Sequence, residues 1–249
     1  MTAIVHVAGV AQSFGDRTIY RDVSFDVAAG EVFVILGGSG CGKSTLMRQV
    51  IGLLPPSQGT VEVLGHDMYA STDPGSVLAR IGVMYQSGAL FGSMTLLENV
   101  MLPLQMQSSL PGPARQDIAR VKLGLVGLAD SAGLMPAEIS GGMAKRAAIA
   151  RAMALDPPLL FLDEPSAGLD PITSAGLDAL ILRLRDELGI TFVVVTHELA
   201  SILAIADRCL MLDRAAAGVI ASGDPRALRD TSTDPTVRAF FRREVLRAA

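Results

Sequence analysis

The chain has 249 residues, of which 50% are hydrophobic and 18% are charged, and its formal net charge is −4. This length suits one large domain or two small lobes, with enough apolar residues for a complete core. The net negative charge does not favour sequence-independent binding of nucleic acid, so we expect no nucleic-acid partner. The absence of any run of about 18 apolar residues predicts that the chain has no transmembrane helix.

The expected compartment follows from the first residues and from the cysteines. The amino-terminal segment lacks the basic start and the apolar core of a secretory signal. The two cysteines, Cys41 and Cys209, indicate neither a disulfide framework nor a metal site. We therefore expect the protein to reside in the cytoplasm.

Three segments near the amino terminus alternate apolar and polar residues: Ile4–Val7, Val23–Val27 and Thr60–Val63. Glycines separate these segments from one another. Alternation with a period of two is typical of half-buried strands. The pattern predicts an antiparallel sheet.

A glycine-rich loop from Gly37 to Thr45 matches the pattern G-x-x-x-x-G-K-[ST] without a mismatch. It follows the apolar run Val32–Leu36, a predicted buried strand, and leads into Ser44–Ile51, the predicted start of a helix. Successive N–H groups of such a loop point at a bound anion, and the helix dipole adds to the attraction. We predict that the loop binds a nucleoside triphosphate through Gly37, Gly38, Ser39, Gly40, Cys41, Gly42, Lys43, Ser44 and Thr45.

Three side chains of this phosphate loop have individual expected roles. Lys43 is expected to reach the β- and γ-phosphates, and the Ser44 hydroxyl is expected to bind Mg²⁺. Cys41 lies among the phosphate-binding amides, so its thiolate is expected to be favoured and its alkylation to block nucleotide entry.

The stretch Ile81–Ala114 carries a single charge, Glu98, and is rich in methionine. Two interpretations of it remain open. The stretch could be core of a helical lobe, which the periodicity places at about residues 95–155. Alternatively, it forms an apolar groove that accepts a helix of a membrane subunit, with Leu90 and Phe91 as its floor.

Two apolar segments in the second half, Leu159–Leu162 and Thr191–Val195, flank the helical pattern of Ala175–Leu188. This order predicts a parallel sheet built from βαβ units. Asp163 and Glu164 directly follow the first of these segments, at the carboxyl end of the predicted strand. Asp163 is placed to hold Mg²⁺, and Glu164 is placed to polarise a water molecule for attack on the γ-phosphate.

The segment Ile139–Met143 reads Ile-Ser-Gly-Gly-Met and opens a predicted helix with Ser140 as its N-cap. It resembles the LSGGQ signature of ABC-type ATPases. The family's other motifs have matches in the family's order: the aromatic residue under adenine at Phe14, the Q-loop at Gln86, the D-loop at Ser166–Asp170 and the switch histidine at His197.

The resemblance implies an α/β fold: a P-loop NTPase (RecA-like) core with an antiparallel β subdomain and an inserted helical subdomain. It implies an ABC ATP-binding domain over residues 1–223 and a helical tail over residues 224–249. A homodimer is also implied, with ATP held between the phosphate loop of one copy and the signature of the other.

The implied cofactors are ATP and Mg²⁺, and the implied catalytic residues are Glu164 and His197. Beyond the phosphate loop, the residues implied to contact the nucleotide are Phe14, Gln86, Ser140, Gly141, Gly142 and Asp170. The implied Mg²⁺ ligands are Ser44, Gln86 and Asp163.

Met143 replaces the usual glutamine of the signature, and in this the chain is similar to the ATPases of MCE-associated phospholipid transporters of the Mla type. That resemblance implies an integral membrane permease, an MCE-domain protein and a small STAS-type accessory subunit as partners. It implies a peripheral position on the cytoplasmic face of the inner membrane. The alternatives are an importer ATPase for another substrate, a soluble ABC-type ATPase acting on DNA or ribosomes, and a nucleotide sensor without turnover.

The carboxy-terminal tail has an amphipathic pattern. One predicted helical face is apolar, and arginines crowd the rest. Packing on its own domain, docking to an accessory subunit and contact with a membrane surface are all compatible with this pattern. The apolar face comprises Val237, Phe240, Phe241 and Val245, and the arginines are Arg238, Arg242, Arg243 and Arg247.

Overall fold

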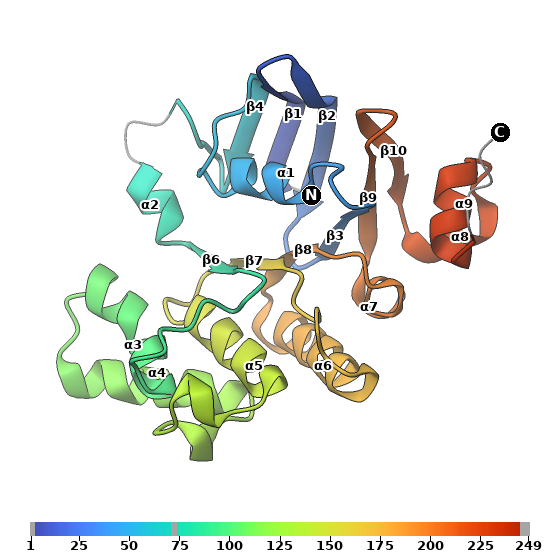
Figure 1. Ribbon diagram of the computed structural model, residues 1–249. Coiled ribbons are helices and arrows are strands. Elements are labelled where there is room, and N and C mark those ends of the chain that lie inside the picture. Colours follow the sequence, from blue (N-terminus) through green and yellow to red (C-terminus); the bar gives the residue numbers. More distant parts are fainter. Residues whose placement is uncertain (1–2, 71–73, 245–249) are drawn as a thin grey trace.

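The computed structural model describes residues 3–70 and 74–244. Its strands form two sheets (Figure 1). The smaller sheet is antiparallel, has the order β2-β1-β4-β5, and confirms the three strands predicted from alternation. Its strands are β1 (Ala3–Phe14), β2 (Arg17–Ala28), β4 (Gln58–Val63) and β5 (His66–Asp67).

The larger sheet has six strands in the order β10-β9-β3-β8-β7-β6. Neighbouring strands are parallel from β9 to β6, and β10 pairs antiparallel with β9, so the predicted parallel sheet is confirmed. Every residue of β3 and β8 is buried, which explains why these strands read as continuous apolar runs. The strands are β3 (Val32–Gly37), β6 (Ile81–Met84), β7 (Leu159–Asp163), β8 (Thr191–Val195), β9 (Arg208–Asp213) and β10 (Gly218–Gly223).

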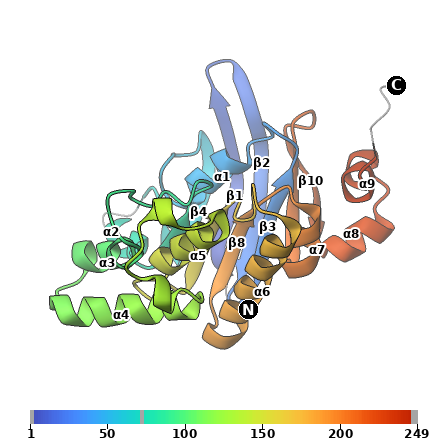
Figure 2. The ribbon, with the colours of Figure 1, turned by 60° about the horizontal axis from the view of Figure 1, so that its bottom comes forward.

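The six-stranded sheet separates two hydrophobic cores, because alternate side chains of a strand point to opposite faces. On one face, Phe33 and Ile35 pack with the antiparallel sheet and with α1 (Lys43–Val50). On the other face, Val34 and Leu36 belong to a core shared with the helices, which lie below the sheet in Figure 1 and in front of it in Figure 2. The short α2 (Pro74–Leu78) precedes β6.

The helices of this second core come from two parts of the chain. The middle of the chain supplies α3 (Leu96–Gln107), α4 (Gly112–Leu125) and α5 (Gly141–Ala152), with the 3₁₀ turns η1 (Ala129–Ser131) and η2 (Pro136–Glu138). Later segments supply α6 (Pro171–Leu188) and α7 (Leu199–Ile205).

The start of α3 is fixed by a capping box. The Thr95 hydroxyl accepts from the Glu98 N–H at 3.2 Å, and the Glu98 carboxylate accepts from the Thr95 N–H at 2.7 Å. The hydrogen bonds that the Glu98 carboxylate accepts from the Thr95 N–H and hydroxyl lower the pKa of Glu98. In the part of the chain that the structure describes, no helix has the length and apolar character to cross a bilayer.

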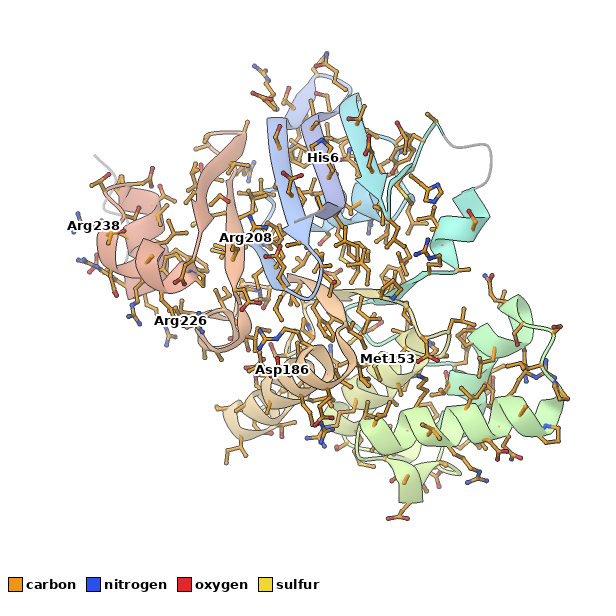
Figure 3. All side chains as sticks on the ribbon, turned by 180° about the vertical axis from the view of Figure 1, so that it is seen from behind. His6, Met153, Asp186, Arg208, Arg226 and Arg238 are labelled. Carbon is orange, nitrogen blue, oxygen red and sulfur yellow. The ribbon has the colours of Figure 1, made fainter. Side chains whose placement is uncertain are left out.

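The carboxy-terminal tail packs on its own domain. It forms α8 (Pro225–Thr231) and α9 (Pro235–Arg242), and Val237 and Phe241 are buried in the core on the helical face of the sheet. Arg226, labelled in Figure 3, donates to the carbonyls of Ala204 and Ala206 at the end of α7. Two residues of the predicted amphipathic pattern, Val245 and Arg247, lie outside the described residues.

Candidate nucleotide-binding and hydrolysis site

The phosphate loop leaves the carboxyl end of β3 and ends in α1. Its turn requires glycine at two positions with positive φ. A Cβ on Gly37 (φ 145°) would lie 2.2 Å from the Leu212 carbonyl oxygen, and one on Gly42 (φ 103°) would lie 2.7 Å from Ile19. Lys43 folds back over the loop, and its Nζ donates to the Gly37 carbonyl at 2.8 Å.

A cavity of about 350 Å³ opens beside this loop. Phe14 lies at the end of β1 with 52% of its surface exposed, and it lines the cavity together with Arg17 and Ile19 of β2. An exposed aromatic ring at the mouth of a polar cavity is suited to stacking on a nucleobase. The other lining residues belong to the phosphate loop and the start of α1: Gly40, Gly42, Lys43, Ser44 and Thr45.

Cys41 does not line this cavity through its side chain. The residue is 1% exposed, and its Sγ lies next to Gly37. Burial raises the pKa of the thiol, although the nearby Lys43 ammonium acts in the opposite direction. The expectation of a favoured thiolate is therefore wrong, because desolvation outweighs the attraction of the loop for a negative charge.

Asp163 is the last residue of β7 and Glu164 follows it, so both carboxylates lie at the same edge of the sheet as the phosphate loop. Glu164 has a left-handed backbone (φ 47°), its N–H donates to the Val195 carbonyl at 2.8 Å, and its Oε1 lies 2.8 Å from Nδ1 of His197. Within the described residues, Glu164 Oε2 and Asp163 Oδ1 are buried oxygens with no hydrogen-bond partner.

Burial is the main cause of a raised pKa at Asp163, and the neighbouring Glu164 charge adds to it. Arg48, Lys43 and Lys145 act in the opposite direction. A buried carboxylate oxygen beside a phosphate loop fits a divalent cation, since Mg²⁺ prefers oxygen ligands and takes several of them from phosphates and water. The described residues offer no group of three or more His, Cys, Asp or Glu that could hold a metal ion alone.

Gln86 follows β6, and its side chain is exposed in the loop after that strand. Its main-chain carbonyl accepts a hydrogen bond from Lys145 Nζ. Burial lowers the pKa of Lys145, and the charges of Asp163 and Glu164 oppose that shift. The motif pattern did not indicate Lys145, because a lysine near the start of a helix usually lies in solvent.

Strand order explains why these separated residues meet. The neighbours β3, β8, β7 and β6 are parallel, so their carboxyl ends share one edge of the sheet. The phosphate loop follows the first of them, and His197, Glu164 and Gln86 follow the next three in turn. One edge thus carries phosphate-binding amides, an ionisable pair and a polar loop.

The signature residues and Asp170 of the D-loop lie away from this sheet edge, at the starts of two helices. Ser140 is the N-cap of α5, and its hydroxyl accepts from the Met143 N–H at 3.3 Å. Asp170 caps α6, with its Oδ1 accepting from the Ile172 and Thr173 N–H groups at 3.0 Å. Neither cap, nor Gly141 and Gly142, lines the cavity beside the phosphate loop.

Comparison with known proteins decides the family. The family described as "ABC transporter" matches residues 20–167, more than half of the chain. The chain belongs to the ABC transporter family. This confirms the recognition made from the motifs, and the chain is an ATP-hydrolysing ABC subunit.

Individual relatives are similar over nearly the whole chain. The intermembrane phospholipid transport system ATP-binding protein MlaF of Escherichia coli K12 is 41% identical over 96% of this chain and 88% of its own length. A probable ribonucleotide transport ATP-binding protein, mkl of Mycobacterium leprae, is 40% identical over 97% of this chain and 69% of its own length.

Solved structures agree with the fold. A dimeric ATP-binding cassette in a post-hydrolysis state, bound to ADP and Pi, superposes with a TM-score of 0.78 at 30% identity, covering 88% of this chain and 98% of the other. The predicted P-loop NTPase fold is therefore confirmed.

Proposed function

We propose that this chain powers the movement of phospholipids through a membrane permease, working as a homodimer that closes around ATP. The observation that carries the proposal is the single sheet edge that joins the phosphate loop, His197, Glu164 and Gln86. These are the parts that phosphoryl transfer to water requires: a phosphate cradle, a base and a group that orients the base.

In the proposed reaction, Glu164 accepts a proton from the attacking water, and His197 holds the carboxylate through the contact at 2.8 Å. Lys43 and the loop amides bind the phosphates, and Phe14 stacks on the base. Ser44, Gln86 and Asp163 would hold Mg²⁺, which supplies charge neutralisation at the phosphates when bound.

The proposed homodimer is supported by the position of the signature. Ser140, Gly141 and Asp170 are exposed but do not line the cavity beside the chain's own phosphate loop. Their exposed caps are available to a nucleotide held by a second copy. The similarity to the dimeric cassette bound to ADP and Pi, which covers 88% of this chain, also supports a dimer.

An apolar groove of about 450 Å³ supports the permease as a partner. It lies where the loop after β6 meets α3, and two of its residues are strongly exposed, Phe91 at 50% and Met106 at 75%. We propose that an apolar helix of the permease occupies it. The residues of the Met-rich stretch therefore have different surroundings. Met84 belongs to the core and Leu90 packs against it, whereas Phe91 and Met106 line the groove.

The phospholipid cargo is supported by the similarity to MlaF over most of both chains. We also propose an MCE-domain protein and a small STAS-type subunit as further partners, and a place on the cytoplasmic face of the inner membrane, as the resemblance of the signature to the Mla-type ATPases implies. The relative named for ribonucleotide transport makes ribonucleotides the second candidate cargo.

The test is transport by the complex purified with its permease. Donor vesicles carry a fluorescent phospholipid, acceptor vesicles carry none, and a parallel assay follows entry of a radiolabelled ribonucleotide. We expect ATP-dependent lipid transfer that Glu164→Gln abolishes, with no ribonucleotide uptake. ATP-dependent ribonucleotide uptake without lipid transfer would replace the proposed cargo by the second candidate.

A further inference from the structure

Lys145 is a buried cation whose contacts are not explained by the roles proposed above. It lies in the second turn of α5, the helix that Ser140 caps, and it is 8% exposed. Burying a charged amine is costly unless hydrogen bonds replace its lost water. Its hydrogen-bond partners therefore indicate what the side chain does.

Both partners of the ammonium group are main-chain carbonyls of the hydrolysis site. Nζ donates to the carbonyl oxygen of Gln86, and to that of Glu164 at 3.3 Å. The first carbonyl belongs to the loop after β6 and the second to the residue directly after β7. Lys145 thus joins the signature helix to both loops at once.

The register of the sheet shows why a side chain is needed at this place. Strands β6 and β7 are parallel, and Met84 pairs with Leu162 at their last shared position. Continuing that register sets Gln86 opposite Glu164, beyond the last residue pair of the ladder. The ammonium group binds the carbonyl on each side.

The Glu164 backbone is the part that such a contact would hold. Its φ of 47° is in the left-handed region, which a non-glycine residue keeps only when surrounding contacts fix it. Its N–H is bound to Val195, and its carbonyl accepts from the Ala167 N–H at 3.2 Å and from Lys145. The same residue presents its carboxylate to His197 at 2.8 Å.

We propose that Lys145 is a positioning residue for ATP hydrolysis: its ammonium group fixes the Glu164 main chain to the Gln86 loop, so that the orientation of the signature helix controls the placement of the catalytic carboxylate. The inference rests on the proposed role of Glu164 as the base. Lys145 itself acts through the main chain of Glu164 and Gln86, the two carbonyls that it binds.

Lys122 provides a matched control within the same group of helices. It lies on α4, is 6% exposed, and its Nζ is paired with the Asp156 carboxylate. The cavity beside it is lined by residues such as Met153 and Leu188, and by none of the hydrolysis-site residues. Replacing either lysine by methionine removes one buried ammonium group and leaves an unbranched side chain of similar length.

The experiment measures ATP hydrolysis and ATP affinity of the full-length chain as Lys145→Met, Lys145→Arg and Lys122→Met. We expect Lys145→Met to lower kcat at least about tenfold, the scale of losing a charge-assisted hydrogen bond, while KM and nucleotide affinity change less than about twofold. Lys145→Arg keeps the charge and the donors and is expected to restore most of kcat. Lys122→Met is expected to lower the melting temperature without lowering kcat.

A double-mutant cycle separates positioning from general damage. Glu164→Gln is measured first, and unchanged turnover in that variant would remove the proposed base itself, independently of Lys145. If Lys145 acts through Glu164, adding Lys145→Met to Glu164→Gln lowers the residual rate by less than about twofold. Full additivity, or equal losses of kcat in the two methionine variants, would overturn the proposal.

A second variant, Lys145→Gln, tests the proposal even if Lys145→Met does not fold. Lys145→Gln keeps an amide donor but is too short to bind both carbonyls, so it is expected to lose kcat in the same way. A folded Lys145→Gln variant with wild-type kcat would also overturn the proposal.

Discussion

At the scale of single residues, the two carboxylate oxygens of the proposed base, Glu164, have different surroundings. The side chain of Glu164 is 11% exposed, whereas that of His197 is 56% exposed. His197 binds Oε1, and Oε2 has no hydrogen-bond partner among the described residues. One oxygen thus fixes the orientation of the carboxylate while the other remains available for a proton.

The first prediction is that Glu164→Gln lowers ATP turnover about a hundredfold or more, because the amide cannot accept the proton from water. Nucleotide binding should persist, since the phosphate loop is unchanged, and size-exclusion chromatography with ATP should show a trapped dimer. The control is Glu187→Gln on α6, an exposed glutamate away from the site. Undiminished turnover in the Glu164 variant would contradict its role.

The second prediction concerns the two thiols. Cys41 and Cys209 are both buried, and burial raises the pKa of Cys41 and raises that of Cys209 to about 12. The native protein at pH 7 should therefore react with maleimide at less than about a tenth of the rate of the unfolded chain. Mass spectrometry with and without denaturant measures the labelling, and rapid labelling of native Cys41 would contradict the buried thiol.

At the scale of elements, the signature helix is positioned by close packing on α6. A Cβ on Gly142 would lie 2.4 Å from Cγ2 of Thr173, in the first turn of α6. The neighbouring Gly141 has more room, because its Cβ would lie 3.7 Å from Leu169. The second glycine of the signature is thus required for packing, as well as being a proposed nucleotide contact.

The third prediction follows from this difference. Gly142→Ala should lower the free energy of unfolding by about 1–3 kcal/mol, the usual cost of overpacking, and Gly141→Ala should cost less. Adding Thr173→Ser removes Cγ2 but keeps the hydroxyl that bonds to Asp170, so the double variant should regain most of the loss. Urea unfolding measures all three, and equal costs at both glycines would contradict the packing argument.

At the scale of the whole molecule, the proposed partner surfaces are the exposed caps of α5 and α6, the groove by α3 and the exposed side of the tail helices. The tail helices α8 and α9 lie on the opposite side of the molecule from α3 and α4 (Figures 1 and 2). Arg238 is on the exposed face of α9 in Figure 3. A permease in the groove and an accessory subunit on the tail would therefore not compete for one surface.

The fourth prediction tests the groove. Phe91→Asp should leave the domain folded and able to bind ATP, because half of this side chain is already exposed, but should prevent co-purification with the permease. The control is Val121→Asp on α4, which is 60% exposed and does not line the groove. Leu90→Asp should instead destabilise the fold, since Leu90 packs against the core. Retention of the permease by Phe91→Asp would place the docking site elsewhere.

The sequence by itself determined the family, the two sheets and the candidate nucleotide residues. The phosphate loop can be recognised in the sequence because its turn places glycines at positive φ. Strands β7 and β8 can be recognised because both are fully or almost fully buried and therefore apolar. In contrast, β6 is four residues long and contains Gly82, whose missing Cβ admits the Ala152 carbonyl of α5. A strand shaped by a neighbouring helix carries little local signal.

Only the tertiary structure decided the burial of Cys41 and Lys145. Cys41 sits in a loop whose local chemistry favours a thiolate, yet its side chain turns into the core and its pKa rises. Lys145 lies in the second turn of α5, yet parallel pairing of β6 and β7 brings two carbonyls to its ammonium group. Burial of a thiol or an ammonium group depends on long-range packing, so residue type and spacing do not specify it; strand order and register do.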